Sequence, residues 1–446
     1  MSDASPFRYR DYRAFWLARV ASTIGNTMLV VVIGIHVYDI ARFDLGMSIH
    51  EASFWLGMIG LAQFLPLFLL TLVAGYVADR VDRRWIVRIS LAMEMSGAAM
   101  LTLLVWLDAM SLVPLFAVAV LLGIGRAFAG PALNSIAPNL VPPAILPSAI
   151  ALNSIAWQIG MVAGPLIGGG AYAVATGLPY QASTALYAAS LAAMMLLRPI
   201  PRGNAGASRP LRAVIEGLAY VRDNKIVLGA ISLDLFAVLL GGATAMLPVY
   251  ARDILHVGSE GLGALRAAPA VGAALTALIL ARRPLKRHVG VKMFVCVAIF
   301  GVATMVFGGS RWMWLSLASL FVLGASDMVS IYVRASLIQL HTPDAMRGRV
   351  SAVSGLFISA SNELGEFRAG LAGAAFGPVV AVVGGGALAV AITGLCAWVF
   401  PSLRKADRFV PPDAELLAEA CGKDVPDVEL PAMVAGMNPQ AEKGRT

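Results

Sequence analysis

Long uncharged apolar stretches run through the chain and are separated by short polar segments. No Asp, Glu, Lys or Arg occurs in residues 52–78, 127–197 or 369–403. Charged side chains are costly at the centre of a bilayer, and a helix that crosses it needs about 20 mostly apolar residues. The longer stretches must hold two or more crossings, divided at the prolines and glycines that interrupt helices. The pattern predicts twelve membrane-spanning helices, at residues 14–40, 52–78, 85–107, 111–137, 148–176, 180–199, 226–251, 261–281, 292–309, 312–340, 347–376 and 378–400.

The composition agrees with a membrane protein. Of the 446 residues, 59% are hydrophobic and 13% are charged, whereas a soluble domain carries about 25% charged residues. This balance excludes an ordinary soluble enzyme and indicates an all-α polytopic membrane protein. The first apolar run is longer than the roughly 7–15 residues of a signal peptide, so we expect the first helix to be retained. Cys296, Cys396 and Cys421 are too far apart for a disulfide framework or a metal site, and we expect inert thiols.

The net charge of +8 reflects the placement of Lys and Arg between the helices. With the N-terminus inside, the segments on the inner side carry 23 of the 34 Lys and Arg, and those on the outer side carry only Arg42, Arg252 and Arg311. This asymmetry follows the positive-inside rule. The sequence therefore predicts a multi-pass protein of a bacterial cytoplasmic membrane with both termini in the cytoplasm, and no nucleic-acid binding.

A polar segment after the sixth predicted helix divides the chain into halves. A shift of 201 residues aligns Leu122-Gly123 with Leu323-Gly324, Arg126 with Asp327, Pro142 with Pro343, and Gly164 with Gly365, without a gap. We expect two six-helix pseudo-repeats at 1–200 and 226–400, a cytoplasmic linker at 201–225, and a mostly disordered cytoplasmic tail at 401–446. Parallel halves of this kind are a transporter architecture, with the substrate site between them.

A motif of glycine, aspartate and arginines lies between the second and third predicted helices. Its sequence is Gly75-Tyr76-Val77-Ala78-Asp79-Arg80-Val81-Asp82-Arg83-Arg84. Gly75 would let two helices approach closely, and Arg80, Arg83 and Arg84 would meet the cytoplasmic head groups. The run resembles the Gly-x-x-x-Asp-Arg-x-x-Arg-Arg motif of the major facilitator superfamily at every fixed position. The resemblance implies the major facilitator fold, with this motif as a cytoplasmic gate.

In the fourth predicted helix, Arg126 is followed four residues later by Gly130. The run resembles the fourth-helix pattern of the superfamily, except that Ala129 stands where a Gln is usual. Arg126 lies too deep in the span to reach water easily, so it should face a polar cavity or a carboxylate partner. The alternative is a structural arginine that holds the helix in place.

The fifth predicted helix carries a face of small residues. It reads Gly160-Met161-Val162-Ala163-Gly164-Pro165-Leu166-Ile167-Gly168-Gly169. Small residues make a flat face that packs closely, and the proline bends the helix. The run resembles the antiporter motif Gly-x-x-x-Gly-Pro-x-x-Gly-Gly of the superfamily, which implies an exporter. The alternative is an ordinary glycine packing face.

The eleventh predicted helix carries two acids on one face. Residues 342–350 and 361–370 resemble the transmembrane secretion-effector branch of the superfamily, which includes enterobactin exporters and macrolide efflux proteins. The resemblance implies that Asp79 meets Arg347 or Arg349 when the substrate cavity faces outward. Glu363 and Glu366 are three residues apart, so they share a helical face. Carboxylates in a span are suited to carry protons; the alternative is a structural lock.

Three further acids, Glu94, Asp234 and Asp327, lie in predicted spans and are candidates for buried charge or proton coupling. Two positions depart from the family pattern. Many relatives carry Gly-Asp in the first helix, whereas this chain has Gly25-Asn26. The segment 281–287, the counterpart of the motif between helices 2 and 3, contains no acid, so the second half lacks the same gate.

These features predict a secondary active exporter of small amphipathic molecules such as drugs, siderophores or secondary metabolites, working by alternating access and proton antiport. The chain has no phosphate-binding loop of the Gly-x-x-x-x-Gly-Lys-Ser/Thr type, and we expect no catalytic site, cofactor or metal. The expected partners are a small-molecule substrate, protons and the lipid bilayer, and we expect a monomer. The alternatives are a proton-coupled metabolite importer and a lipid-handling membrane protein or membrane enzyme that uses Asp327, Glu363 and Glu366.

Overall fold

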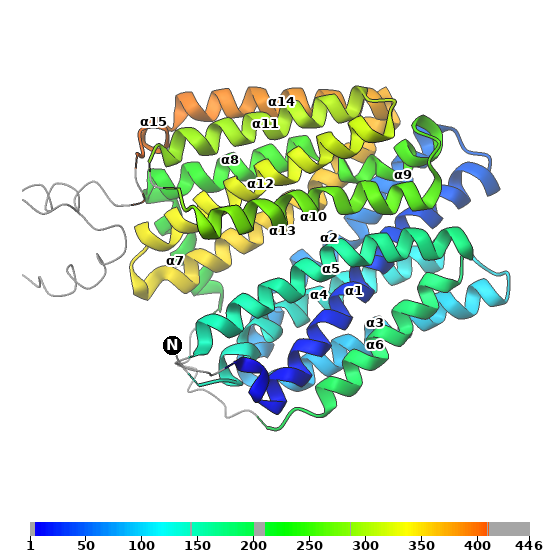
Figure 1. Cartoon of the computed structure of the whole chain (residues 1–446), viewed down its shortest axis with the longest axis horizontal. Coiled ribbons are helices and arrows are strands. Elements are labelled where there is room, and N and C mark those ends of the chain that lie inside the picture. The colour runs from blue at the N-terminus through cyan, green and yellow to red at the C-terminus, as the bar shows by residue number, and fades with distance from the viewer. Residues whose placement is uncertain (1–4, 143–144, 200–209, 286, 408, 410–446) are drawn as a thin grey trace, which may run out of the picture.

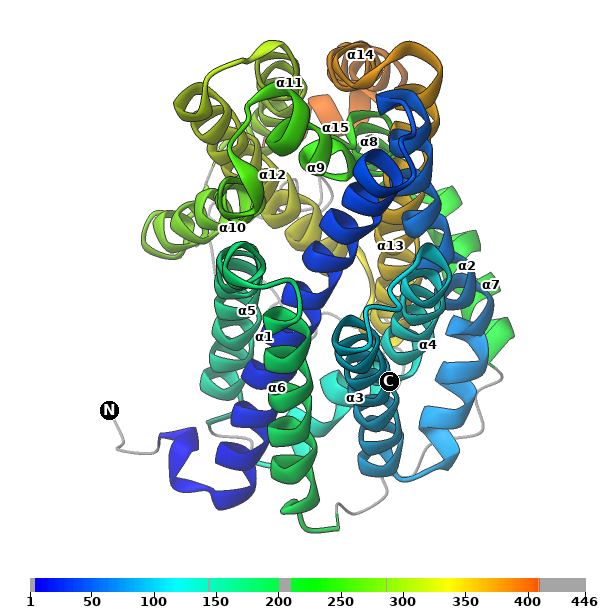
Figure 2. The ribbon, with the colours of Figure 1, turned by 90° about the vertical axis from the view of Figure 1, so that its right-hand side faces the viewer.

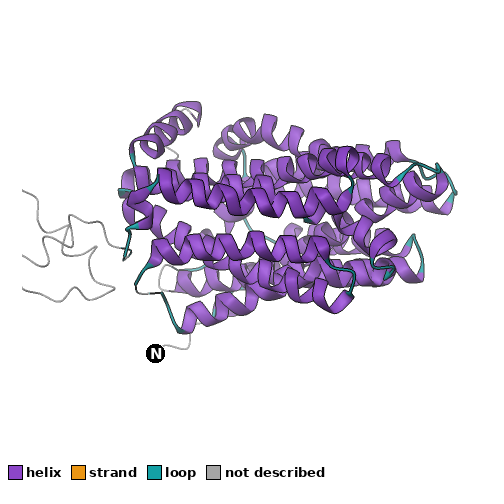
Figure 3. Ribbon diagram, turned by 90° about the horizontal axis from the view of Figure 1, so that it is seen from above, coloured by secondary structure: helices purple, strands orange, loops and turns teal. Residues whose placement is uncertain are grey.

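The computed structural model describes residues 5–142, 145–199, 210–285, 287–407 and 409, and in this part of the chain helices are joined by short turns with no strand (Figures 1 and 3). The first six long helices are α1 (Arg10–Asp39), α2 (Ile49–Arg80), α3 (Arg83–Trp106), α4 (Leu112–Ile136), α5 (Leu146–Val174) and α6 (Leu178–Met195). After α7 (Pro210–Asp223) come α8 (Lys225–Gly241), α9 (Leu247–Val249), α10 (Gly258–Arg282), α11 (Val289–Gly309), α12 (Met313–His341), α13 (Asp344–Phe376), α14 (Pro378–Val399) and α15 (Pro401–Arg404).

The twelve predicted spans are confirmed, with boundaries that differ by a few residues. Within the described residues, ten helices are long and apolar enough to cross a membrane. The helices α6 and α13 complete the twelve, and α13 carries the charged residues Glu363, Glu366 and Arg368. The chain is therefore an all-α polytopic membrane protein, as its hydrophobic pattern predicts.

The long helices form two bundles, a first bundle of α1–α6 and a second bundle of α8–α15 (Figure 1). Across the seam between them, α2 packs against α13 and α5 packs against α10 (Figure 2). We call the end of the molecule that holds the N-terminus, α7 and α15 the N-terminal face, and the other end the opposite face (Figure 1). We propose that the two halves of the chain are divided by the segment between residues 200 and 226.

The two bundles approach most closely toward the opposite face. There the backbones of α2 and α13 nearly touch, since a Cβ added to Gly57 would lie 2.8 Å from the Cα of Gly370. Near the N-terminal face, a Cβ added to Gly75 of α2, or to Gly348 or Gly355 of α13, would have no atom within 4 Å. The seam is thus closed at the opposite face, and the bundles diverge toward the N-terminal face (Figure 1).

The predicted helix 226–251 is broken, which corrects the prediction of one continuous helix. The helix α8 ends at Gly241, and a short 3-10 turn, η5 (Thr244–Met246), precedes α9. Consecutive glycines favour a break because they have the most backbone freedom to lose in a helix. A Cβ at Gly242 would meet the carbonyl oxygen of Gly365 at 2.9 Å. The break therefore lets α13 come close and leaves Thr244 beside the acids of α13.

Two π-helical turns lie at the opposite face, one in each bundle. They are η2 (Ile40–Asp44), which extends α1, and η6 (Tyr250–Ile254), which extends α9. Each carries an Ala-Arg pair, Ala41-Arg42 in the first and Ala251-Arg252 in the second. The turns place corresponding arginines of the two bundles at the seam.

The predicted linker contains a helix that its polar composition did not indicate. This helix, α7, packs against α13 and α8 on the N-terminal face. The predicted disordered tail at 401–446 is described only as far as α15 and the turn that follows it, and residues 410–446 lie outside the described residues.

Candidate functional site

A charged pair joins the two bundles within the membrane spans. The Nη1 atom of Arg126 in α4 donates a hydrogen bond to Oε1 of Glu363 in α13, at 2.7 Å. The side chain of Arg126 is 37% exposed, whereas that of Glu363 is 8% exposed. The expected carboxylate partner of Arg126 is therefore an acid of the other bundle, and the arginine is the partner that solvent or a ligand can reach.

The second acid of the same helical face has different partners. Glu366 accepts a hydrogen bond from Thr244 at 3.2 Å and forms an ion pair with Nη2 of Arg266 in α10, at 3.5 Å. Arg266 also donates to the backbone carbonyl of Thr244, at 3.0 Å. All three residues belong to the second bundle, so Glu366 stabilises one bundle whereas Glu363 connects two. Arg368 donates instead to the carbonyl of Leu239.

A small pocket of about 40 Å³ lies at the seam beside Glu366. Its walls come from α1, α2, η5, α9, α10 and α13, and they are mostly apolar. The polar side chains on the walls are those of Gln63, Thr244, Arg266 and Glu366. Convergent polar groups in an apolar wall are typical of small-molecule sites, but such sites measure about 300–1,000 Å³, so this pocket is too small to hold a substrate in the present structure.

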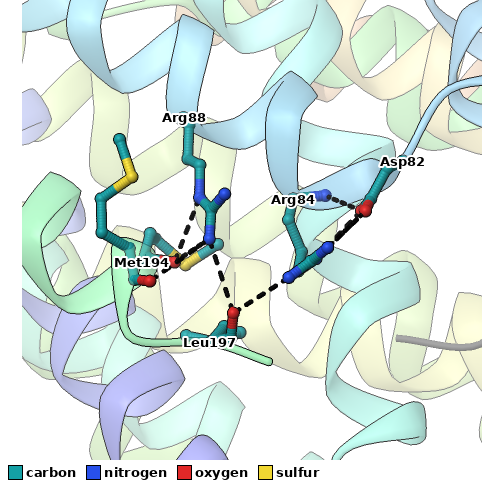
Figure 4. A network of polar contacts seen from close by, with 6 residues as sticks. Asp82, Arg84, Arg88, Met194 and Leu197 are labelled. Carbon is teal, nitrogen blue, oxygen red and sulfur yellow. Dashed lines mark hydrogen bonds and ion pairs between the residues drawn. The ribbon is translucent and has the colours of Figure 1, made fainter. Parts of the chain in front are cut away.

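The arginines that follow Asp79 do not all point toward head groups, which corrects the prediction for Arg84. Its guanidinium is buried, pairs with Asp82 at 2.6 Å and donates to the carbonyl of Leu197 at 3.0 Å (Figure 4). Arg88 donates to the carbonyl of Met194 in the same way. Arginines stabilise helix C-termini by binding their last carbonyls. Arg84 and Arg88 therefore fix the start of α3 to the end of α6.

Asp82 directly precedes α3 and caps its N-terminus. Its Oδ1 accepts a hydrogen bond from the backbone N–H of Arg84 at 3.0 Å, as an N-cap residue does. The side-chain hydrogen bond from Arg84 is the main cause that lowers the pKa of Asp82 below its ordinary value. The sequence motif thus contains a structural cap in addition to its predicted gate.

The remaining residues of the predicted gate lie on the N-terminal face. Arg80 is exposed and Arg83 is half-buried, whereas the side chain of Asp79 is outside the described structure. Arg347 donates to the carbonyl of Gln339 at 3.0 Å, and Arg349 forms an ion pair with Glu216 of α7 at 2.6 Å. The predicted contact with Asp79 belongs to the outward-facing cavity and stays a prediction, because this structure is closed at the opposite face.

The antiporter motif packs in two directions rather than on one flat face. A Cβ at Gly164 would lie 2.9 Å from the carbonyl oxygen of Ile24, and one at Gly168 would lie 2.9 Å from Cγ of Met28, both in α1. Gly160 also faces α1, where its carbonyl accepts a hydrogen bond from Thr27 at 2.8 Å. These three glycines therefore hold α5 inside the first bundle.

The last glycine of the motif faces the other bundle. A Cβ at Gly169 would lie 2.8 Å from the Cα of Gly263 in α10, and the carbonyl oxygen of Pro165 lies against the same residue. This contact of α5 with α10 crosses the seam close to the opposite face. The motif thus combines packing within one bundle with closure between the two.

The other predicted acids lie inside single bundles. Glu94 of α3 is buried against Gly125 of α4, where an added Cβ would lie 2.6 Å from its Oε1. Asp234 of α8 forms a buried ion pair with Arg334 of α12. Asp327 lies near Asp234 around a small internal pocket of the second bundle. None of these three acids is paired across the seam in the described structure.

The opposite face is closed by charged contacts that sequence reasoning did not predict. Arg252 of η6 pairs with Asp39 at the end of α1. Asp39 also accepts a hydrogen bond from the hydroxyl of Tyr172 at 3.1 Å. A pocket of about 420 Å³ lies beside this pair. Ile40 and Ala251 of the same turns belong to one buried apolar cluster that spans both bundles, so the polar contacts add to apolar packing here.

A second charged contact lies next to the first. Asp253 of η6 accepts a hydrogen bond from Tyr38 and pairs with Nε of Arg42 at 3.3 Å. We call the two contacts the opposite-face lock; it consists of Tyr38, Asp39, Arg42, Tyr172, Arg252 and Asp253. An acid and an arginine stand at the end of both the first and the seventh predicted helix, and this was the feature of the sequence that could have indicated the lock.

Two six-helix bundles, closed at one face by cross-seam contacts and joined inside the spans by a charged pair, define a secondary transporter of the major facilitator type. The chain belongs to the transmembrane secretion effector family, because the model of that family, MFS_3, matches residues 1–419. This confirms the fold and the branch that the motifs predict.

Named relatives agree with the family assignment, and solved structures share the fold. The chain is 25% identical over 406 residues to "Enterobactin exporter EntS" of Shigella boydii serotype 18, covering 88% of this chain and 92% of that protein. It is 24% identical over 347 residues to the protein of the same name from Citrobacter koseri, covering 77% and 80%. The fold is similar to that of a POT family transporter in complex with 5-aminolevulinic acid (TM-score 0.69, 13% identity, 89% of this chain and 97% of that chain). It is also similar to a D-xylose-proton symporter (TM-score 0.68, 13% identity, 88% and 98%).

Proposed function

We propose that this transporter is a proton-coupled exporter in which the Arg126–Glu363 pair is the coupling site. The observation that carries the proposal is the position of this pair, which connects the two bundles at 2.7 Å inside the spans. A buried ion pair is broken when its acid is neutralised, and losing one partner of such a pair is costly. Protonation of Glu363 therefore changes the free energy of the contact between the two bundles. Proton coupling requires such a change.

The transport cycle follows from the state of the pair. In this structure Glu363 is bound to Arg126, which corresponds to the deprotonated acid, and the seam is closed at the opposite face. With the N-terminal face in the cytoplasm, this is the inward-facing state that receives substrate. In the outward-facing state a proton from the outside neutralises Glu363, releases Arg126 and permits the return of the carrier. The proton then leaves to the cytoplasm and the pair forms again, so each export step is coupled to one inward proton.

The orientation rests on charge. The N-terminal face carries the arginine-rich turn between α2 and α3, together with α7 and the start of α13, whereas the opposite face has few cations. By the positive-inside rule the N-terminal face is cytoplasmic, in the inner membrane of a bacterium. Both termini then lie in the cytoplasm.

The substrate proposal is a small amphipathic molecule such as a drug, a siderophore or another secondary metabolite. Two observations support it: the residues that line the seam beside Glu366 are mostly apolar with a few polar groups, and two relatives are named enterobactin exporters. The acids serve transport rather than catalysis in this proposal, and no cofactor takes part. We propose that one chain suffices, because both bundles that enclose the seam belong to it.

The proposal is tested by expression in an efflux-deficient bacterial host. A panel of dyes, antibiotics and siderophores is scored for resistance and for cellular accumulation, with and without an uncoupler. We expect lower accumulation of at least one compound, reversed by the uncoupler. Everted membrane vesicles that have been acidified inside should then take up that compound and lose protons from the lumen.

Two outcomes would contradict the proposal. Uptake into right-side-out vesicles together with inward proton movement would establish an importer. Turnover or flipping of a labelled lipid without any gradient would instead establish a lipid-handling protein. Glu94→Gln is a matched control in the same assay, because Glu94 is a buried acid that does not face the other bundle.

A further inference from the structure

The linker helix α7 lies directly on the beginning of α13, at the N-terminal face. The two backbones meet at Gly217, where an added Cβ would lie 2.8 Å from the carbonyl oxygen of Arg349 and 3.0 Å from Cγ2 of Val353. Such an approach requires glycine on α7, because any side chain would collide with the backbone of α13. The crossing point of the two helices is therefore at Arg349.

At this crossing an acid of α7 holds the arginine of α13. Oε2 of Glu216 lies 2.6 Å from Nη1 of Arg349, and the two side chains are 34% and 41% exposed. Below the pair, Val221 of α7 packs with Val350 and Val353 in a small apolar cluster. The apolar cluster fixes α7 on the second bundle, so the ion pair is an additional and separable contact at its edge.

Arg349 is also one of the two arginines of α13 that are predicted partners of Asp79 in the gate motif. An arginine that is bound to Glu216 offers fewer donors to a second carboxylate, and each carboxylate also has to be desolvated to bind it. The linker helix therefore competes with the motif between α2 and α3 for one guanidinium. Since α7 lies between α6 and α8 in the chain, it is attached to both bundles.

We propose that Glu216 is a positioning residue for transport: it holds Arg349 on the linker helix while the opposite face is closed, and it must release Arg349 to Asp79 before the N-terminal face can close. This inference rests on the proposed alternating access. It predicts that Glu216 and Asp79 act in opposite directions on one equilibrium, although both are acids and both would bind the same cation.

The experiment measures distances across the seam by electron paramagnetic resonance in the full-length protein in lipid nanodiscs. The three native cysteines are replaced by serine, and spin labels are attached to exposed positions. One pair, Val81→Cys with Leu340→Cys, reports the N-terminal face, and the other, Leu45→Cys with Trp314→Cys, reports the opposite face. Each variant is measured with both label pairs at one pH and one salt concentration.

Glu216→Gln should raise the ratio of molecules closed at the N-terminal face to those open there by about two- to fivefold, the range for a partly exposed ion pair. Asp79→Asn should lower the same ratio. Glu216→Asp should stay close to wild type. The charge swap Glu216→Arg with Arg349→Glu should lower the ratio, as Asp79→Asn does, because it restores the contact with the linker helix but leaves Asp79 facing a like charge. Asp223→Asn is the matched control, because Asp223 is an exposed acid on the same helix, and it should have no effect.

The variant Arg252→Ala separates this inference from the proposed function, because it removes a contact of the opposite-face lock. If Arg252→Ala and Asp79→Asn shift the distances and Glu216→Gln behaves like Asp223→Asn, the role of Glu216 is wrong and alternating access stands. If no variant shifts either distance, alternating access itself is contradicted. A shift of Glu216→Gln in the same direction as Asp79→Asn would also overturn the inference.

Discussion

The two acids on one face of α13 differ in function because of what lies opposite each of them. Their spacing of three residues predicted a shared face, and the nearby Arg368 donates to the carbonyl of Leu239 rather than to either acid. The sequence could not predict that Glu363 binds Arg126 whereas Glu366 binds Arg266. Helical periodicity shows which residues of one helix are neighbours, but it does not show which other helix faces them.

The unequal exposure of Arg126 and Glu363 predicts unequal effects of removing either residue. Arg126→Gln leaves the buried Glu363 without its cation, which should lower the free energy of unfolding by up to about 3–5 kcal/mol. Glu363→Gln leaves an arginine that water can reach, so its effect should be smaller. Thermal unfolding of the purified protein in detergent measures the loss of stability of both single variants. The double variant should be more stable than Arg126→Gln alone. Equal losses in the two single variants, or a double variant no better than Arg126→Gln, would refute this view of the pair.

Asp82 predicts a pH-dependent contribution to stability. Because Arg84 lowers the pKa of Asp82 in the folded protein, its stabilisation is present above the unfolded pKa of about 3.9. It is lost as the pH falls through the lower folded pKa. Asp82→Asn keeps a side chain that can cap the helix, so at neutral pH it should cost only the partly exposed ion pair with Arg84, about 0.2–1 kcal/mol. The difference in melting temperature from wild type should shrink in strong acid, whereas a difference independent of pH would contradict the assigned role.

At the scale of helices, the sequence predicted positions and lengths well and directions of packing less well. Charged residues, prolines and glycines located all twelve spans, because the bilayer imposes a length and excludes charge. The break at Gly242 and the helix α7 were not predicted. The break depends on the close approach of α13, and α7 is amphipathic rather than apolar and gains its stability by packing on α13.

The glycines of α5 provide a matched pair for testing close packing. An added methyl at Gly164 would displace Thr27 and collide with the backbone of α1, whereas one at Gly170 meets no atom within 4 Å. Gly164→Ala should lower the free energy of unfolding by about 1–3 kcal/mol, as overpacking does. Gly170→Ala should be neutral or slightly stabilising, because alanine is the better helix former. Thermal unfolding and transport should both separate the two variants, and equal behaviour would refute the packing argument.

At the scale of the whole molecule, the sequence predicted the family and the two halves. It did not predict which face of the seam between them is closed. The state is defined by contacts across the seam: the opposite-face lock, the contact of Gly169 with Gly263, and the Arg126–Glu363 pair. Each of these joins residues more than 90 positions apart in the chain. Motifs within one segment cannot reveal such pairs, so the residues of the lock were found only in the structure.

The central claim is that Glu363 couples transport to protons, and it is tested most directly in proteoliposomes that contain the purified protein and a compound identified in the efflux panel. Two rates are compared for wild type and Glu363→Gln: exchange of labelled for unlabelled compound without a gradient, and accumulation driven by an imposed pH difference. Glu363→Gln should retain exchange but lose at least about tenfold of the driven accumulation, whereas Glu94→Gln should retain both. Driven accumulation at the wild-type rate in Glu363→Gln would contradict the account and move the coupling site to another acid.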